Sequence, residues 1–169
     1  MKTNHKFGLI IGRFQPPCLH HFQFINEAIN SGIQKLLIGV GESQFFDNRN
    51  FLSAAEIQSL LIPNLDNLNI PYKLVTIPDI NDPKNYAKHV KKILPEINEI
   101  NTCLFTENSY TSDCFINYGN NFKVVTPTIL DNRATNVRQL ILENNPNWQK
   151  LVPENVLQYI IKNNKIPNL

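Results

Sequence analysis

The chain has 169 residues, and because one domain usually contains roughly 100–200 residues, two full domains are not expected. Charged residues make up 18% of the composition and hydrophobic residues 42%, which is typical of a folded globular protein whose polarity comes largely from uncharged side chains such as asparagine. The formal net charge of +2 excludes the strongly basic class of nucleic-acid-binding domains.

No apolar run approaches the ~18 residues of a membrane-spanning helix, and the apolar segment near the amino terminus is too short for a signal-peptide core. Three cysteines, Cys18, Cys103 and Cys114, form an odd set without CxxC spacing, which indicates neither a disulfide framework nor a zinc site. We therefore expect a cytoplasmic protein with reduced thiols, no membrane contact, no nucleic-acid partner and no resident metal ion.

The first predicted strand is the apolar run over residues 7–12, which ends in glycine and resembles a strand buried on both faces of a parallel sheet. A helix over residues 21–31 follows, and Gly32 is placed to end it. Residues 35–41 repeat the strand-to-glycine pattern. These three segments predict a strand–helix–strand unit of a parallel sheet.

The alternation of strand and helix continues to the end of the chain. A helix is predicted over residues 53–61, where Ser53 and Glu56 form a capping-box pattern. Further strands are predicted over 73–77, 102–105 and 122–125, and further helices over 85–94, 136–143 and 156–163. This order predicts an α/β fold, a Rossmann-like doubly wound parallel sheet, in a single domain over residues 1–169.

Open α/β sheets bind ligands beyond the carboxyl ends of their strands, where helix N-termini favour anions. Residues 12–21 occupy this position after the first strand and carry Arg13, His20 and His21. An arginine fork and a protonated imidazole both bind phosphate. The alternative interpretation is that both histidines are ordinary solvated residues at the start of a helix.

Arginine is rare in this chain and is confined to segments that follow predicted strands. Only four of the 16 basic residues are arginines, namely Arg13, Arg49, Arg133 and Arg138. Arginine binds phosphate through two parallel hydrogen bonds, whereas lysine acts as a point charge. The placement of the arginines favours a phosphate-binding crevice at one edge of the sheet.

These residues resemble a known family. The run Gly12-Arg13-Phe14-Gln15-Pro16, followed by His21, resembles the GRFQPxHxGH signature of the nucleotidyltransferase superfamily. Residues 38–44, 49–56 and 134–138 resemble, in order, the IGIGSAQ, RxPFTAGE and GTEVR motifs of the archaeal-type nicotinamide-nucleotide adenylyltransferases, and the resemblance covers nearly the whole chain. It implies adenylyl transfer from ATP to nicotinamide mononucleotide, which gives NAD and pyrophosphate, with Mg²⁺ on the ATP phosphates and a symmetric homo-oligomer.

The resemblance also implies roles for individual residues. The implied catalytic residues are His21, His20 and Arg138. The implied ATP- and phosphate-binding residues are Gly12, Arg13, Phe14, Cys18, Arg49, Arg133, Thr135 and Arg138. The implied acceptor-binding residues are Tyr86, Asn85 and Ser43, and the aromatic face of Tyr86 is suited to stack on the cationic nicotinamide ring.

The chain departs from the family pattern where phosphates are expected. Cys18 stands in the place of the first motif histidine, and a neutral thiol is a weaker donor than an imidazolium. His20 replaces the motif glycine and Arg133 the serine before GTEVR, and these residues either compensate for the lost histidine or accompany lost catalysis. Two alternatives therefore stay open: a catalytically silent nucleotide-binding or regulatory protein, and nucleotidyl transfer to another acceptor.

Overall fold

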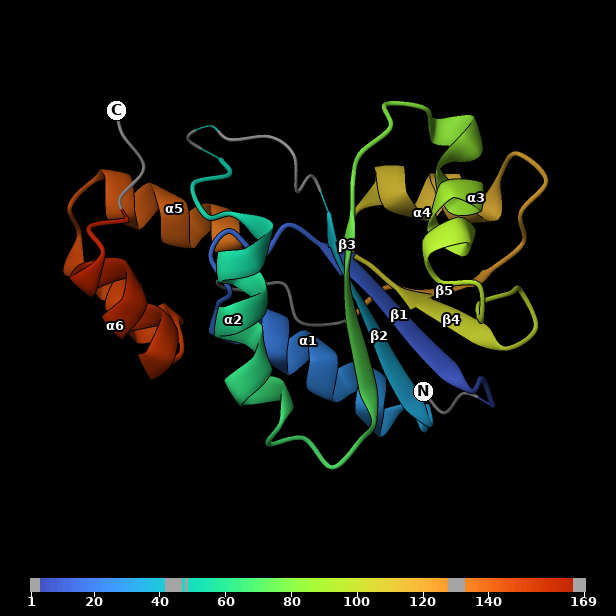
Figure 1. Ribbon diagram of the computed structural model, residues 1–169, viewed down its shortest axis with the longest axis horizontal. Coiled ribbons are helices and arrows are strands. Elements are labelled where there is room, and N and C mark those ends of the chain that lie inside the picture. Colours follow the sequence, from blue (N-terminus) through green and yellow to red (C-terminus); the bar gives the residue numbers. More distant parts are fainter. Residues whose placement is uncertain (1–3, 42–46, 48, 128–132, 166–169) are drawn as a thin grey trace.

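Five parallel strands form one sheet in the order β3-β2-β1-β4-β5 (Figure 1). The computed structural model describes residues 4–41, 47, 49–127 and 133–165. The strands are β1 (Phe7–Gly12), β2 (Lys35–Gly41), β3 (Tyr72–Ile77), β4 (Thr102–Phe105) and β5 (Lys123–Val125). From β1 the chain adds β2 and β3 on one side, then crosses back and adds β4 and β5 on the other side. The doubly wound parallel sheet predicted from the sequence is therefore confirmed.

Helices cover both faces of the sheet (Figure 1). One hydrophobic core lies between the sheet and the helices α1 (Leu19–Asn30), α2 (Ala54–Leu65), α5 (Ala134–Leu142) and α6 (Glu154–Lys162). A second core lies between the other face and the helices α3 (Pro83–Ile93) and α4 (Ser109–Ile116). Successive strand residues alternate between the cores, so that Ile10 belongs to the first and Leu9 to the second.

The observed strands agree with the predicted ranges to within one residue at each end. Helix ends differ more. α1 begins at Leu19, two residues earlier than predicted, and the chain leaves it through Gly32, whose φ of 97° is readily adopted only by glycine. α2 begins after Ser53 with the predicted capping box, but it continues through Pro63 to Leu65, four residues beyond the predicted end. The extension buries the Leu65 side chain completely, and this packing opposes the cost of a proline inside the helix.

Two elements are absent from the sequence-based prediction. They are α4 and the short 3₁₀ helix η1 (Pro146–Leu151). α4 has only eight residues, too few for a clear hydrophobic period. The Asn108 side chain caps it by accepting a hydrogen bond from the Thr111 N–H at 3.3 Å. An asparagine three residues after the end of a predicted strand is therefore the available signal for this helix.

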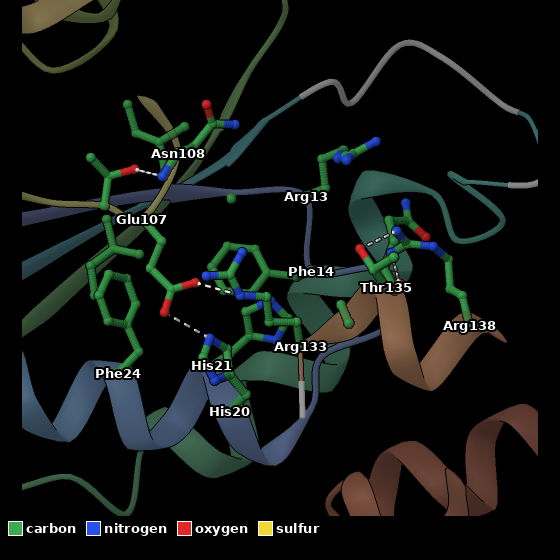
Figure 2. Close-up of a pocket in the computed structure, with 16 residues that line it drawn as sticks. Arg13, Phe14, His20, His21, Phe24, Glu107, Asn108, Arg133, Thr135 and Arg138 are labelled. Atoms are coloured by element: carbon green, nitrogen blue, oxygen red, sulfur yellow. Dashed lines mark hydrogen bonds and ion pairs between the residues drawn. The ribbon is translucent and has the colours of Figure 1, made fainter. Parts of the chain in front are cut away.

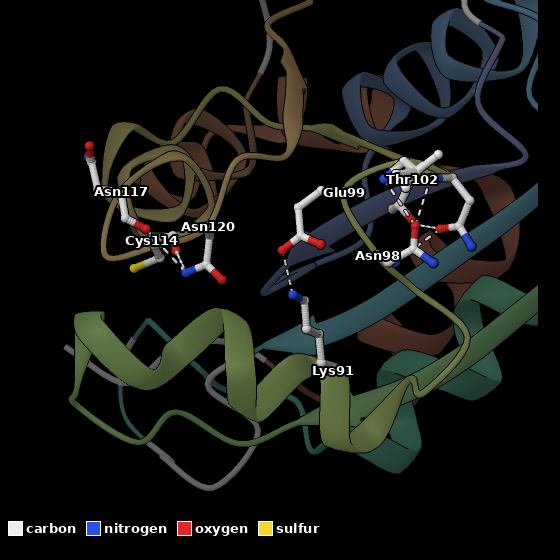
Figure 3. Close-up of polar contacts among 9 residues, drawn as sticks. Lys91, Asn98, Glu99, Thr102, Cys114, Asn117 and Asn120 are labelled. Carbon is white, nitrogen blue, oxygen red and sulfur yellow. Dashed lines mark hydrogen bonds and ion pairs between the residues drawn. The ribbon is translucent and has the colours of Figure 1, made fainter.

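Asparagine side chains hold several turns around the second core (Figure 3). Asn98 Oδ1 accepts hydrogen bonds from the N–H groups of Ile100 at 3.0 Å and Asn101 at 2.9 Å. Asn120 Nδ2 donates to the Cys114 carbonyl oxygen at 3.2 Å. These bonds explain how a chain with few charges satisfies the backbone of its loops.

Candidate active site

A pocket of about 210 Å³ lies at the carboxyl ends of β1 and β4, beside the starts of α1 and α5 (Figure 2). This is the edge of the sheet at which the fold predicts ligand binding. Several residues expected at the ATP phosphates line it, namely Gly12, Arg13, Phe14, His20, His21, Arg133, Thr135 and Arg138. The remaining lining residues are Ile10, Ile11, Gln15, Phe24, Thr106, Glu107, Asn108 and Ala134.

The loop after β1 is held by its own buried side chains. Gln15 is 3% exposed and pairs with the Leu52 backbone, donating from Nε2 to the carbonyl oxygen at 2.7 Å and accepting the N–H at Oε1 at 2.9 Å. The buried Phe14 ring packs on the His21 imidazole with 4.8 Å between ring centroids. Gly12 lies against the same ring, because a Cβ there would meet Phe14 Cε2 at 3.3 Å. The loop therefore holds His21 on a rigid support.

His21 is fixed in one protonation state by the start of α1. The backbone N–H of Cys18 donates to Nδ1 of His21 at 3.0 Å, so this nitrogen is an acceptor and the neutral ring carries its hydrogen on Nε2. Burial, followed by the charges of His20 and Arg138, lowers the pKa of His21 from 6.5 to about 3. His21 is therefore a neutral N–H donor beside the pocket at neutral pH.

Arg138 is a buried cation at the other end of the pocket, with 8% of its surface exposed. Its Nη1 donates to the Gln15 carbonyl oxygen at 2.6 Å, and its Nη2 donates to Thr135 Oγ1 at 3.1 Å. Among the described residues no carboxylate forms an ion pair with it, and burial, with the charges of Arg13 and Arg49, lowers its pKa. The charge of Asp47 acts on Arg138 only as a smaller, opposing contribution, and a buried cation without an ion-pair partner is costly, so this arrangement is suited to an anionic ligand.

Glu107 is a pocket residue that none of the sequence motifs contains. Its side chain is 15% exposed, and its Oε2 lies 3.2 Å from Arg133 Nε. Its Oε1 lies 3.2 Å from His20 Nε2, a distance that qualifies as an ion pair if His20 is protonated, although the geometry falls outside that of a hydrogen bond. His20 is only 5% exposed, so the interpretation of this histidine as an ordinary solvated residue is wrong. The position of Glu107 just beyond a predicted strand was the signal that could have identified it.

A second pocket of about 100 Å³ adjoins the first. Both are lined by Gly12, Arg13 and Asn108, so Arg13 lies at their junction. Tyr86, which the resemblance assigns to the acceptor nucleotide, lines this second pocket together with Tyr110. The two pockets thus offer two neighbouring compartments at one edge of the sheet.

Other predicted site residues are not brought into either pocket. Cys18 is fully buried in the core at the start of α1, and burial raises the pKa of its thiol to about 11, so it is an unreactive thiol. Arg49 is exposed and lines neither pocket. Asn85 is exposed and its Nδ2 donates to Asp82 Oδ2 at 2.7 Å. Ser43 lies outside the described residues.

The described part of the chain contains no group of three or more histidine, cysteine or acidic side chains that could hold a metal ion. Nor does it contain a helix that is both long and apolar enough to cross a membrane.

Sequence comparison identifies relatives over most of the chain. No protein-family model matches it. A curated protein of Thermococcus sibiricus named nicotinamide-nucleotide adenylyltransferase is 32% identical over 160 residues, which cover 90% of this chain and 82% of the relative. The protein of the same name from Pyrococcus furiosus is 30% identical over 163 residues, which cover 92% of this chain and 82% of that relative.

Structure comparison finds the same fold in proteins with lower sequence identity. A bifunctional NMN adenylyltransferase/ADP ribose pyrophosphatase from Francisella tularensis, complexed with AMP and a Mn ion, matches with a TM-score of 0.68 and 20% identity. The match covers 94% of this chain and 49% of that protein, so this chain spans about half of its length. Plasmodium falciparum nicotinic acid mononucleotide adenylyltransferase matches over 95% of this chain with a TM-score of 0.58 and 12% identity.

Proposed function

The chain belongs to the nicotinamide-nucleotide adenylyltransferase family, and from this premise we propose that it transfers the adenylyl group of ATP to nicotinamide mononucleotide (NMN), giving NAD and pyrophosphate. In this reaction an oxygen of the NMN phosphate forms a bond to the α-phosphorus of ATP. The bond from the α-phosphorus to the oxygen shared with the β-phosphate breaks, and pyrophosphate leaves. The protein contributes by orienting the two nucleotides and by stabilising negative charge on the phosphates.

The observation that carries this proposal is the buried Arg138 without a carboxylate partner among the described residues. A triphosphate supplies the negative charge that the buried guanidinium lacks. Thr135 holds the same guanidinium at the start of α5, where the helix N-terminus also favours an anion. We therefore assign the β- and γ-phosphates of ATP to Arg138.

His21 and Arg13 take roles that follow from their positions. Nε2–H of the neutral His21 donates a hydrogen bond to a phosphate oxygen of ATP, and this role requires no proton transfer. Arg13 lines both pockets, so it binds phosphate where the two nucleotides meet. Tyr86 stacks on the nicotinamide ring in the second pocket.

Mg²⁺ enters this proposal as part of the substrate, bound to the phosphates of ATP. The described residues include no cluster of acidic side chains that would hold the ion by themselves. Mg²⁺ is commonly held largely by substrate phosphates and water, which agrees with this arrangement. The bifunctional Francisella protein, half of which matches this chain, was solved with AMP and a Mn ion, which is compatible with a divalent ion as part of the substrate.

The test is NAD formation by the purified protein from ATP, Mg²⁺ and NMN, with nicotinate mononucleotide assayed in parallel. We expect NAD to accumulate together with an equal amount of pyrophosphate. Absence of product with either acceptor, in protein that ATP still stabilises against heat, would instead support the catalytically silent alternative. Product with an unrelated phosphate acceptor only would support the alternative of another acceptor.

A further inference from the structure

Glu107 joins two parts of the pocket that are far apart in the sequence (Figure 2). It follows β4, whereas its partners lie in α1 and directly before α5. Its side chain is 15% exposed, so a carboxylate is held in a site that water reaches poorly. Arg133 Nε lies 3.2 Å from one of its oxygens and His20 Nε2 lies 3.2 Å from the other, although the His20 contact lacks hydrogen-bond geometry.

The contact between Glu107 and Arg133 involves only the Nε nitrogen of the guanidinium. Arg133 Nε faces Glu107 Oε2 at 3.2 Å. The terminal nitrogens Nη1 and Nη2 have no hydrogen-bond or ion-pair partner within residues 4–41, 47, 49–127 and 133–165. Arg133 is half-exposed and its side chain reaches into the pocket that Arg138 also lines (Figure 2). With respect to the described residues, the terminal nitrogens of Arg133 are therefore open to a phosphate.

His20 supports Glu107 from the opposite side. Its side chain is 6% exposed and its Nε2 is directed at Glu107 Oε1. Its Nδ1 has no hydrogen-bond partner among the described residues. Because His20 is enclosed and already faces Glu107, it acts on the pocket through this carboxylate.

We propose that Glu107 is a positioning residue for adenylyl transfer, which aims the terminal nitrogens of Arg133 at the triphosphate. This inference rests on the proposed function, because it assigns the triphosphate to the same pocket. This role of Glu107 explains how the chain, which has Cys18 in place of the first motif histidine, keeps Arg133 as a second cation at the phosphates beside Arg138. The negative charge of Glu107 is balanced by Arg133, so it opposes ATP binding only weakly.

The test is a double-mutant cycle in the full-length protein with E107Q, R133A and the double variant. The matched control is E99Q, which makes the same substitution in an ion pair with Lys91 away from the pocket (Figure 3). We expect E107Q to lower kcat/KM for ATP by about 10- to 100-fold, since a misplacement of about 1 Å costs about 100-fold. We expect the double variant to be no worse than R133A, because Glu107 acts through Arg133.

Three results would overturn the proposal: wild-type kinetics of E107Q, higher activity of E107Q, or losses that multiply in the double variant. Higher activity would instead identify Glu107 as a latch that holds Arg133 away from ATP. R133K provides a second test that does not depend on the folding of E107Q, because its single ammonium cannot contact Glu107 and present a fork as well. Full activity of R133K would also contradict the proposal.

The same variants separate this proposal from the proposed function. If the wild-type protein forms no NAD, the double-mutant cycle uses another readout. The rise in Tm that ATP causes is then measured for the wild type, E107Q, R133A and the double variant. A loss of this rise in E107Q and R133A, with no loss in E99Q, would support the positioning role alone. NAD formation by the wild type, with E107Q unaffected, would overturn the positioning role and leave the proposed function intact.

Discussion

His21 shows how a helix start selects the chemistry of a side chain. Its Nδ1 accepts the Cys18 N–H, so protonation of the ring would break a hydrogen bond of the helix cap. Burial, and after it the charges of His20 and Arg138, lowers the pKa of His21 from 6.5 to about 3, and the hydrogen bond from Cys18 is compatible with the neutral ring. The residue therefore acts as a hydrogen-bond donor throughout the neutral pH range.

This protonation state makes the stability of the fold depend on pH. The unfolded chain binds a proton at this histidine below about pH 6.5, whereas the folded chain does not until about pH 3, so the free energy of unfolding should decrease as the pH falls through this interval. Urea unfolding between pH 7 and 5 measures the decrease. In H21N, which keeps a cap acceptor but cannot titrate, the decrease should be smaller. An unchanged slope in H21N would show that His21 takes up its proton over the same pH range in the folded and in the unfolded chain.

Arg138 is predicted to matter for ATP more than for NMN. Loss of one well-placed donor to a developing phosphate charge costs about 10²–10³ in rate, so R138A should lower kcat/KM for ATP by this factor. ATP at 100 times its Kd should stabilise the wild type by about 2.7 kcal/mol, and R138A should lose most of this gain at the same concentration. R138K keeps the positive charge but not the planar guanidinium. Its kcat/KM for ATP and its stabilisation by ATP should lie between those of the wild type and of R138A. A kcat/KM for ATP in R138A equal to that of the wild type, with the full stabilisation by ATP retained, would contradict the assignment.

Much of the pocket could be predicted from the sequence, because short motifs after strands occur at the edge where parallel strands end. His21, Arg13 and Arg138 lie where the motifs indicate. Glu107 also follows a predicted strand, so its place at the pocket could have been inferred, but its pairing with Arg133 across 26 positions of sequence is described by no motif. Cys18 was expected at the phosphates but lies in the hydrophobic core instead of lining the pocket. Its small apolar side chain packs there, where a histidine would have been costly to bury.

At the level of the elements, Glu56 ties α6 to α2. Its carboxylate completes the capping box with Ser53, accepts a hydrogen bond from the Tyr159 hydroxyl at 2.6 Å and pairs with Lys165 Nζ at 2.8 Å. Burial alone would raise the pKa of Glu56, but the hydrogen bonds from Lys165, Tyr159 and Ser53 outweigh it and lower the pKa to about 2. One side chain thus stabilises both the start of one helix and the position of another.

We expect E56A to lower the free energy of unfolding by about 0.5–2 kcal/mol at pH 7, the range for loss of a helix cap. The contribution of Glu56 is present above pH 4.5 and is lost as the pH falls toward 2, so the difference between wild type and E56A should narrow over that interval. Y159F, which removes only one of the hydrogen bonds, should show a smaller effect. Equal destabilisation by E56A at pH 7 and pH 3 would contradict a role of the ionised carboxylate.

The sequence predicts well those elements that have a continuous or regularly spaced set of apolar residues, or a residue that clearly marks where the element ends. β1 and β2 are continuous apolar runs in the middle of the sheet, and their bounds follow from the glycines that end them. α4 is short and η1 is a 3₁₀ helix, so neither has a period that could be recognised. Tertiary packing decides such elements, and a single sequence carries little information about it.

For the molecule as a whole, two adjoining pockets at one edge of the sheet match a reaction that joins two nucleotides. Arg13 lies at their junction, and the buried Arg138 lies in the larger pocket. The sheet order places both pockets at the carboxyl ends of strands, beside β1, where the strand order reverses. The fold thereby brings together the groups that the two substrates require.

The most direct test of adenylyl transfer follows the phosphorus atoms of ATP. The purified protein is incubated with NMN, Mg²⁺ and ATP labelled at either the α- or the γ-phosphate, and the NAD and pyrophosphate are separated. Label from the α-phosphate should appear only in NAD, and label from the γ-phosphate only in pyrophosphate. Label from the γ-phosphate in the nucleotide product, or no transfer of the α-label although ATP binds, would contradict the assigned reaction.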